Sequence, residues 1–276
     1  MKYYVVILII CLGHFRMQAQ SKSIADLNKS LQNLAVVHYE NYTNCINMDS
    51  MTLATGQKLV TILKQQKITL SDSIPNLKIL SSNDSAIIVY TFSYDSGGTR
   101  GYVDNPVIQW RKKDGSLGAY ELFPAKKKEY FGIETLFYKI HKLPSKDKGL
   151  YLLIGNEKED SHTIVGIAIV IQLKNDNLIL DYPAFLNQAS TLVYVEDLFA
   201  EDNLENNVSK TESGDVVSSD DCGMGCIPYE VQSKTISFTM GKNDAIRLVK
   251  PNRVFNDDIK QRNIKLYFNG TTFVLK

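Results

Sequence analysis

The sequence contains few of the residues that mark metal centres and nucleic-acid interfaces. Its 276 residues include four histidines and four cysteines, and they form neither an H-E-x-x-H motif nor a paired-cysteine zinc motif. The formal net charge is +1, so the chain has no basic excess of the kind that binds phosphate backbones. We therefore expect no metal site, no cofactor and no nucleic-acid partner.

Long hydrophobic runs are also missing. A membrane-spanning helix needs about 20 consecutive apolar residues. The longest run after the N-terminus, 164–171, is interrupted by Gly166 and stops at Gln172. We expect no membrane span in the mature chain.

The N-terminus has the pattern of a segment that is removed on export. Lys2 precedes an apolar run over 5–12, and a polar stretch ends at Gln20. Such a short run between a positive charge and small or polar residues is typical of a secretory signal. We predict a signal peptide over 1–20 and an exported protein that is periplasmic, cell-surface or secreted.

The remaining composition favours β structure. Fifteen tyrosines and eleven phenylalanines fit pleated surfaces, and a hydrophobic fraction of 44% is enough for a sizeable core. Within 21–70, apolar residues recur at steps of three and four, first over 24–38 and then over 49–64, although Gly56 weakens the second pattern. We predict two N-terminal helices.

From residue 87 onward the apolar pattern alternates with a period of two, which indicates strands. Asp114-Gly115 and Asn269-Gly270 are typical of tight hairpin turns, and 175–177 suits a third turn. Further strands are expected over 107–110, 117–123, 135–141, 150–154, 163–173, 178–181, 192–196, 235–240, 264–268 and 271–275. Short connections favour antiparallel pairing. We predict one mainly β (α+β) domain over 21–276, with antiparallel sheets in a sandwich- or propeller-like arrangement behind two helices.

One segment differs from the rest of the chain. Residues 201–221 carry seven acidic residues against a single lysine, with Ser, Asn and Gly between them. This composition cannot bury enough apolar surface to repay the entropy of ordering. We predict an acidic mobile insertion.

Three short stretches are similar to parts of exported proteins of Gram-negative bacteria. They are Ala19-Gln20, the stretch 94–99 (YDSGGT) with 107–110 (VIQW), and the terminal 266–273 (LYFNGTTF). The resemblance implies a β-rich body and a location in the envelope or outside the cell. It implies no catalytic residue, because those proteins have no assigned chemistry.

The mature chain keeps an odd number of cysteines, since Cys11 leaves with the signal segment. Cys222 and Cys226 are separated by three residues, two of them glycine, which favours a local disulfide between them. Pairing of Cys45 with either one is the next possibility. Acidic residues just upstream raise a thiol pKa, so redox catalysis is disfavoured.

Six residues are candidates for a ligand site. Asp95, Asp104 and Glu121 lie on or beside neighbouring predicted strands and could form the carboxylate pair of a glycan hydrolase, about 5 to 10 Å apart. Trp110, with Tyr102 and Tyr120 nearby, could stack on a sugar ring, although core packing within a hairpin is the more common use of such a residue.

Two functional hypotheses follow from these residues and from the predicted export. We favour an exported, non-catalytic binding or structural protein of the cell envelope, with a glycan or a protein as its ligand. The alternative is a secreted glycan hydrolase. A cleft that holds two carboxyl groups at the required spacing would separate the second hypothesis from the first.

Overall fold

The computed structural model describes residues 22–35, 45–69, 74–97, 101–122, 135–145, 149–158, 163–197, 226–241, 244–250, 255–259 and 263–276. The predicted signal peptide (1–20) and the predicted acidic insertion (201–221) lie outside these ranges. The predicted fold class is confirmed, since the described part is mainly β, with antiparallel sheets and two helices.

Both predicted N-terminal helices are present. The described part of the first covers 22–35, and its Leu27, Leu31 and Leu34 are buried at the spacing expected of one helix face. The second, α2, covers Cys45–Leu63 and begins four residues earlier than predicted. Its buried face is made by Leu59, Ile62 and Leu63 together with Thr52 and Thr55, so it is more polar than the sequence pattern suggested. Neither described helix is long and apolar enough to cross a membrane.

A first sheet follows the helices and contains β1 (Leu77–Ser81), β2 (Ile87–Gly97), β3 (Gly101–Arg111) and β4 (Leu117–Glu121) in chain order. All its neighbours are antiparallel. The alternation predicted for β2 is confirmed, because Ile88, Tyr90 and Phe92 face the helices while Ile87 and Val89 face the next sheet.

The central sheet has seven strands: β5 (Leu136–Lys142), β6 (Leu150–Lys158), β7 (Thr163–Lys174), β8 (Asn177–Ile179), β9 (Thr191–Asp197), β12 (Ala245–Val249) and β13 (Phe255–Ile259). Its order is β13-β12-β9-β7-β6-β5, with β8 paired to β7. The predicted turn at 175–177 is confirmed as the β7–β8 hairpin, where Asn175 and Asp176 both have positive φ.

The C-terminal sheet has the order β10-β11-β14-β15. Its strands are β10 (Tyr229–Glu230), β11 (Thr235–Thr239), β14 (Asn263–Phe268) and β15 (Phe273–Leu275). The Asn269-Gly270 hairpin is confirmed, with its turn one residue later than predicted, because the Asn269 amide donates to the Thr272 carbonyl and leaves Gly270 and Thr271 between them. A short 3-10 helix, η3 (Leu186–Gln188), precedes β9.

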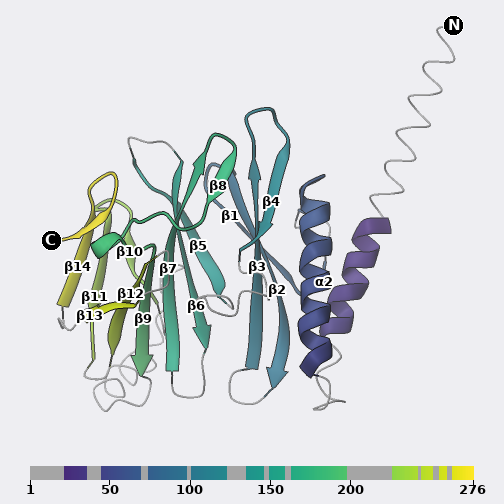
Figure 1. Cartoon of the computed structure of the whole chain (residues 1–276), viewed down its shortest axis with the longest axis horizontal. Helices are drawn as coiled ribbons and strands as arrows, with labels where there is room; N and C mark the ends of the chain where they lie inside the picture. Colours follow the sequence, from purple (N-terminus) through teal and green to yellow (C-terminus); the bar gives the residue numbers. More distant parts are fainter. Residues whose placement is uncertain are drawn as a thin grey trace, which may run out of the picture.

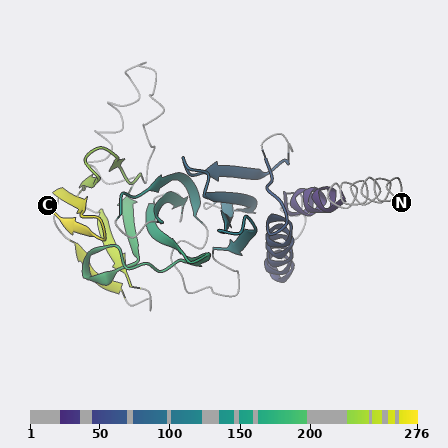
Figure 2. The same ribbon diagram turned by 90° about the horizontal axis from the view of Figure 1, so that it is seen from above.

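These elements stack in four layers (Figures 1 and 2): the two helices, the first sheet, the central sheet and the C-terminal sheet. Each interface between layers holds its own hydrophobic cluster. The central sheet is covered on both faces, so consecutive residues of its strands are apolar. On β6, Tyr151 and Leu153 pack toward the first sheet, whereas Leu152 and Ile154 pack toward the C-terminal sheet. The stacking is that of a sandwich with an extra sheet.

Candidate functional site

Strand register decides which of the candidate ligand residues share a face of the first sheet. Directly paired residues in an antiparallel ladder point to the same side. Ser93 pairs with Asp104, and Asp95 pairs with Tyr102. All four lie on the face that Ile87 and Val89 turn toward the central sheet.

A polar group therefore occupies this face near the end of the β2–β3 hairpin, and we call it the hairpin cluster: Lys78, Ser93, Asp95, Tyr102 and Asp104. Lys78 belongs to it because it pairs with Thr91, which has the same orientation as Ser93. Tyr102 is 66% exposed, which makes it the most exposed of the large hydrophobic side chains in the described part. The cluster thus combines an accessible aromatic ring with a lysine, a hydroxyl and two carboxylates.

Asp104 is the most strongly perturbed member of the hairpin cluster. The Ser93 hydroxyl donates a hydrogen bond of 2.5 Å to Asp104 Oδ1. Burial raises the pKa of Asp104, and both this hydrogen bond and the positive charge of Lys78 oppose the rise. The carboxyl is therefore held in a fixed position by its neighbour on β2.

Glu121 lies on the opposite face of the sheet from Asp104. It pairs with Val107, which packs toward the helices. Its side chain is buried, its Oε1 has no hydrogen-bond partner, and burial raises its pKa to about 7. The three candidate carboxylates therefore do not form one site.

The physical reason is the length of the β3–β4 loop. A two-residue turn at Asp114-Gly115 would place Glu121 opposite Ile108, on the same face as Asp104. In the structure the Lys112 amide bonds the Ser116 carbonyl at 2.9 Å, so three residues form the loop and Gly115 takes a φ of +83°. This shift of one residue turns Glu121 toward the helices.

Trp110 and Tyr120 share the face of the hairpin cluster but lie away from it. The Trp110 ring packs against Gly118, where an added β-carbon would meet the ring at 2.2 Å. Its Nε1 donates a 2.9 Å hydrogen bond to the Asp176 carbonyl in the β7–β8 turn. Trp110 therefore joins two sheets, which is a packing function. Tyr120 pairs with Ile108, six residues and about 20 Å along β3 from Tyr102.

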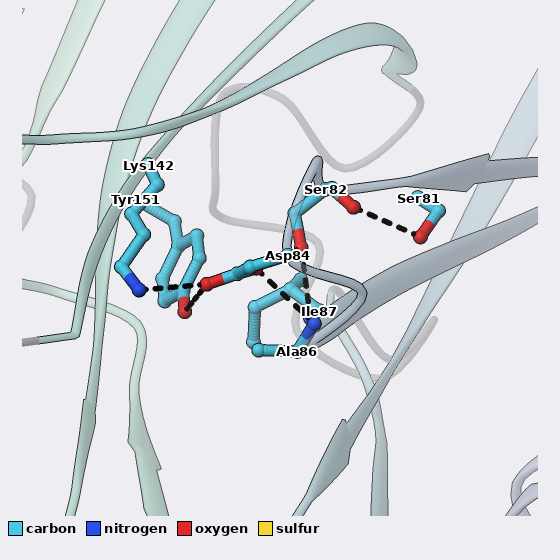
Figure 3. Close-up of polar contacts among 7 residues, drawn as sticks. All are labelled: Ser81, Ser82, Asp84, Ala86, Ile87, Lys142 and Tyr151. Atoms are coloured by element: carbon cyan, nitrogen blue, oxygen red, sulfur yellow. Dashed lines mark hydrogen bonds and ion pairs between the residues drawn. The ribbon is translucent and has the colours of Figure 1, made fainter.

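A second polar cluster, which the sequence analysis did not find, joins the first and central sheets (Figure 3). Asp84, in the β1–β2 turn, contacts Lys142 Nζ at 2.8 Å and accepts a 2.9 Å hydrogen bond from the Tyr151 hydroxyl. The Ser82 hydroxyl and the Ala86 amide also donate to its carboxylate. Burial acts to raise the pKa of Asp84, but Lys142 and these hydrogen bonds lower it to about 2. Tyr151 is 67 residues away in sequence, so no local signal marks this contact.

Of the histidines and cysteines, the side chains of His141 and Cys226 belong to the described part of the chain. In the part of the chain that the structure describes, no group of three His, Cys, Asp or Glu side chains could hold a metal ion. His141 packs against Tyr229 with ring centroids 5.0 Å apart, and burial lowers its pKa. The Cys226 sulfur lies 3.7 Å from the Tyr138 hydroxyl that donates to it. Cys222 and the side chain of Cys45 lie outside the described part, so the pairing of the cysteines stays a prediction.

In comparisons with known proteins, no family model, no curated protein and no solved structure matched the chain.

Proposed function

We propose that the chain is an exported, non-catalytic binding or structural protein of the cell envelope, and that the hairpin cluster is where its ligand binds. The observation that carries this proposal is the division of the candidate carboxylates between two faces. Glu121 is buried against the helix layer, whereas Asp104 lies on the other face and is hydrogen-bonded to Ser93. A hydrolase built on Glu121 would need its carboxyl to reach a substrate.

The chemistry of the hairpin cluster suits a ligand rich in hydroxyl groups. An exposed tyrosine ring can stack on the apolar face of a sugar, while its neighbouring carboxylates accept hydrogen bonds from sugar hydroxyls. Lys78 and Asp104 add charge of both signs, so the cluster does not favour a strongly charged polymer. A glycan of the envelope is the first ligand to test, and a protein surface is the second.

Binding of purified mature protein to soluble cell-wall oligosaccharides, measured by titration calorimetry, tests the proposal. We expect Tyr102→Ala to weaken binding at least tenfold, because the stacking ring is lost. Tyr120→Ala is the matched control, since it removes an exposed tyrosine from the same face about 20 Å away. Equal affinities of both variants and the wild type would contradict binding at the hairpin cluster.

The glycan hydrolase stays a second candidate because of Asp95 and Asp104. They share a face as diagonal neighbours across β2 and β3, a position that separates residues by about 7–8 Å. Inverting glycosidases use carboxyl groups about 6.5–9.5 Å apart. Release of reducing ends by the wild type, abolished in Asp95→Asn and Asp104→Asn but retained in Asp114→Asn, would support the hydrolase. No release by any of them would support the binding protein.

A further inference from the structure

Glu121 is the only acidic or basic side chain that is buried among the described residues. It ends β4 and is 8% exposed. A β-carbon added to Gly56 of α2 would lie 2.8 Å from Glu121 Oε1, so the carboxyl fills the space directly over that glycine. This contact explains a glycine in the middle of a helix, where it costs about 1 kcal/mol relative to alanine.

Two polar atoms near this contact lack hydrogen-bond partners. Neither Glu121 Oε1 nor the buried Thr52 Oγ1 has a hydrogen-bond partner. Thr52 precedes Gly56 by four residues, so both lie on the same side of α2. A protonated carboxyl can be buried in such a place at moderate cost, whereas an ionised carboxylate without a partner costs far more.

The C-terminal end of α2 and the residues just after it, in contrast, are hydrogen-bonded to the first sheet. Gln109 Nε2 donates hydrogen bonds to the carbonyls of Leu63 and Gln66, at 2.5 and 2.9 Å. The Tyr90 hydroxyl contacts the Ile68 carbonyl and Gln109 Oε1, each at 3.1 Å. None of these groups titrates near neutral pH.

We propose that the contact between Glu121 and Gly56 makes the docking of α2 on the first sheet pH-sensitive. When Glu121 loses its proton, the central turns of α2 separate from β4, while Gln109 and Tyr90 keep the end of the helix attached. The N-terminal helix moves with α2, because Lys58 Nζ of α2 bonds Ser30 Oγ at 2.7 Å and the Asp26 carbonyl.

Among the described residues, no charged side chain lies beside Glu121 to stabilise its ionised form. On α2, Lys58 is directed to the N-terminal helix, whose Asp26 and Lys29 are exposed. On β3, Asp104 lies on the face opposite Glu121. Arg111 is exposed and lies four residues along the strand from Val107, the residue paired with Glu121. Facing groups on β2 are the hydroxyls of Tyr90 and Tyr94, which carry no charge near neutral pH. Burial is accordingly the single cause of the raised pKa of Glu121.

The direction of the effect follows from the pKa of about 7 in the docked state. Once the contact opens, the carboxyl is solvated and its pKa returns to the usual 4.5. Opening is therefore independent of pH below about 4.5, and it becomes more favourable as the pH rises toward and through 7. Between pH 5 and pH 8 the equilibrium constant for opening should increase about 70-fold.

Hydrogen exchange of the mature protein, corrected for the intrinsic exchange rate at each pH, tests this inference. In the wild type we expect the amides of residues 52–60 to lose about 70-fold in protection between pH 5 and pH 8. Glu121→Gln keeps the shape of the side chain but cannot ionise, so its protection should change less than threefold. Glu230→Gln, an exposed glutamate of the C-terminal sheet, should behave as the wild type. The same loss in Glu121→Gln, or no loss in the wild type, would overturn the inference.

Carbon-13 NMR titration of the Glu121 carboxyl in the wild type gives a second readout that needs no variant. A midpoint near pH 7, with α2 amide shifts that change at the same midpoint, would support the inference. A midpoint below pH 5, or α2 amides that do not follow it, would refute it.

Discussion

Asp84 allows a quantitative prediction about how the first sheet is attached to the central sheet. Replacing it with alanine removes the ion pair to Lys142 and leaves the buried Tyr151 hydroxyl without its acceptor. The lowered pKa of about 2, against the usual 3.8, corresponds to about 2 kcal/mol. Because the Asp84 side chain is 30% exposed, solvent screening reduces this part to about 1 kcal/mol.

The unpaired Tyr151 hydroxyl adds about 1–2 kcal/mol, the usual cost of a buried group that loses its hydrogen bond. We expect Asp84→Ala to lower the free energy of unfolding by about 2–3 kcal/mol and the Tm by about 5–10 °C. Asp84→Asn keeps Oδ1 as the acceptor for Ser82 and Ala86, and its amide nitrogen can donate to the Tyr151 hydroxyl oxygen. Its loss should therefore be about 1 kcal/mol, mainly that of the charge.

The contribution of Asp84 to the free energy of unfolding should decrease as the pH falls. A carboxyl whose pKa is lowered by folding contributes stability above its unfolded pKa and loses it as the pH falls through the folded pKa. The charge-dependent part of the difference between wild type and Asp84→Ala should therefore be constant from pH 5 to 7 and disappear between about pH 4 and 2. Urea denaturation at each pH measures it, with Asp26→Ala on the exposed side of the N-terminal helix as the control. If Asp84→Ala lowered the free energy of unfolding by less than about 0.5 kcal/mol, which is near the experimental error, the reasoning would be refuted. A loss that grows as the pH falls would refute it as well.

Four further predictions concern other parts of the chain. Trp110→Phe removes the hydrogen bond to the Asp176 carbonyl and should cost about 1–2 kcal/mol in chemical denaturation; an unchanged midpoint would mean that Trp110 does not join the sheets. N-terminal sequencing of protein from the envelope fraction should start near Ser21, whereas an intact Met1 would contradict export. Peptide mapping without reductant should find Cys222 linked to Cys226 and Cys45 as a free thiol; a peptide linked through Cys45 would show that this assignment is wrong. Deleting 205–218 should leave the Tm nearly unchanged, and a loss of several degrees would show that the segment is structural.

Local periodicity was sufficient to predict the helices and most strands. In β2 the alternation of Ile87 to Phe92 fixes both the strand and its two faces, because side chains of a strand alternate with a period of two. The strands β1, β10, β12 and β13 were not predicted. Two of them, β1 and β12, have five residues each: β1 has no buried side chain, and the alternation of β12 covers only four residues, so neither gives a strong strand pattern.

The arrangement of the site depended on details that a sequence does not display. Glu121 changed faces because the β3–β4 loop has three residues rather than two, and a register shift of one residue reverses every side chain of the strand. In the sequence Gly56 only weakened the helical pattern of α2. In the structure its missing side chain leaves the space that the Glu121 carboxyl fills. Both features arise from contacts between elements far apart in the chain.

Mass spectrometry of a defined cell-wall oligosaccharide, incubated in large molar excess with the mature protein that binds it, tests the proposed function most directly. A non-catalytic binding protein leaves the mass of the glycan unchanged while the complex forms, and Tyr102→Ala reduces the amount of complex. Glycan fragments in molar excess over the protein, absent with Asp104→Asn, would contradict the proposal and establish hydrolysis.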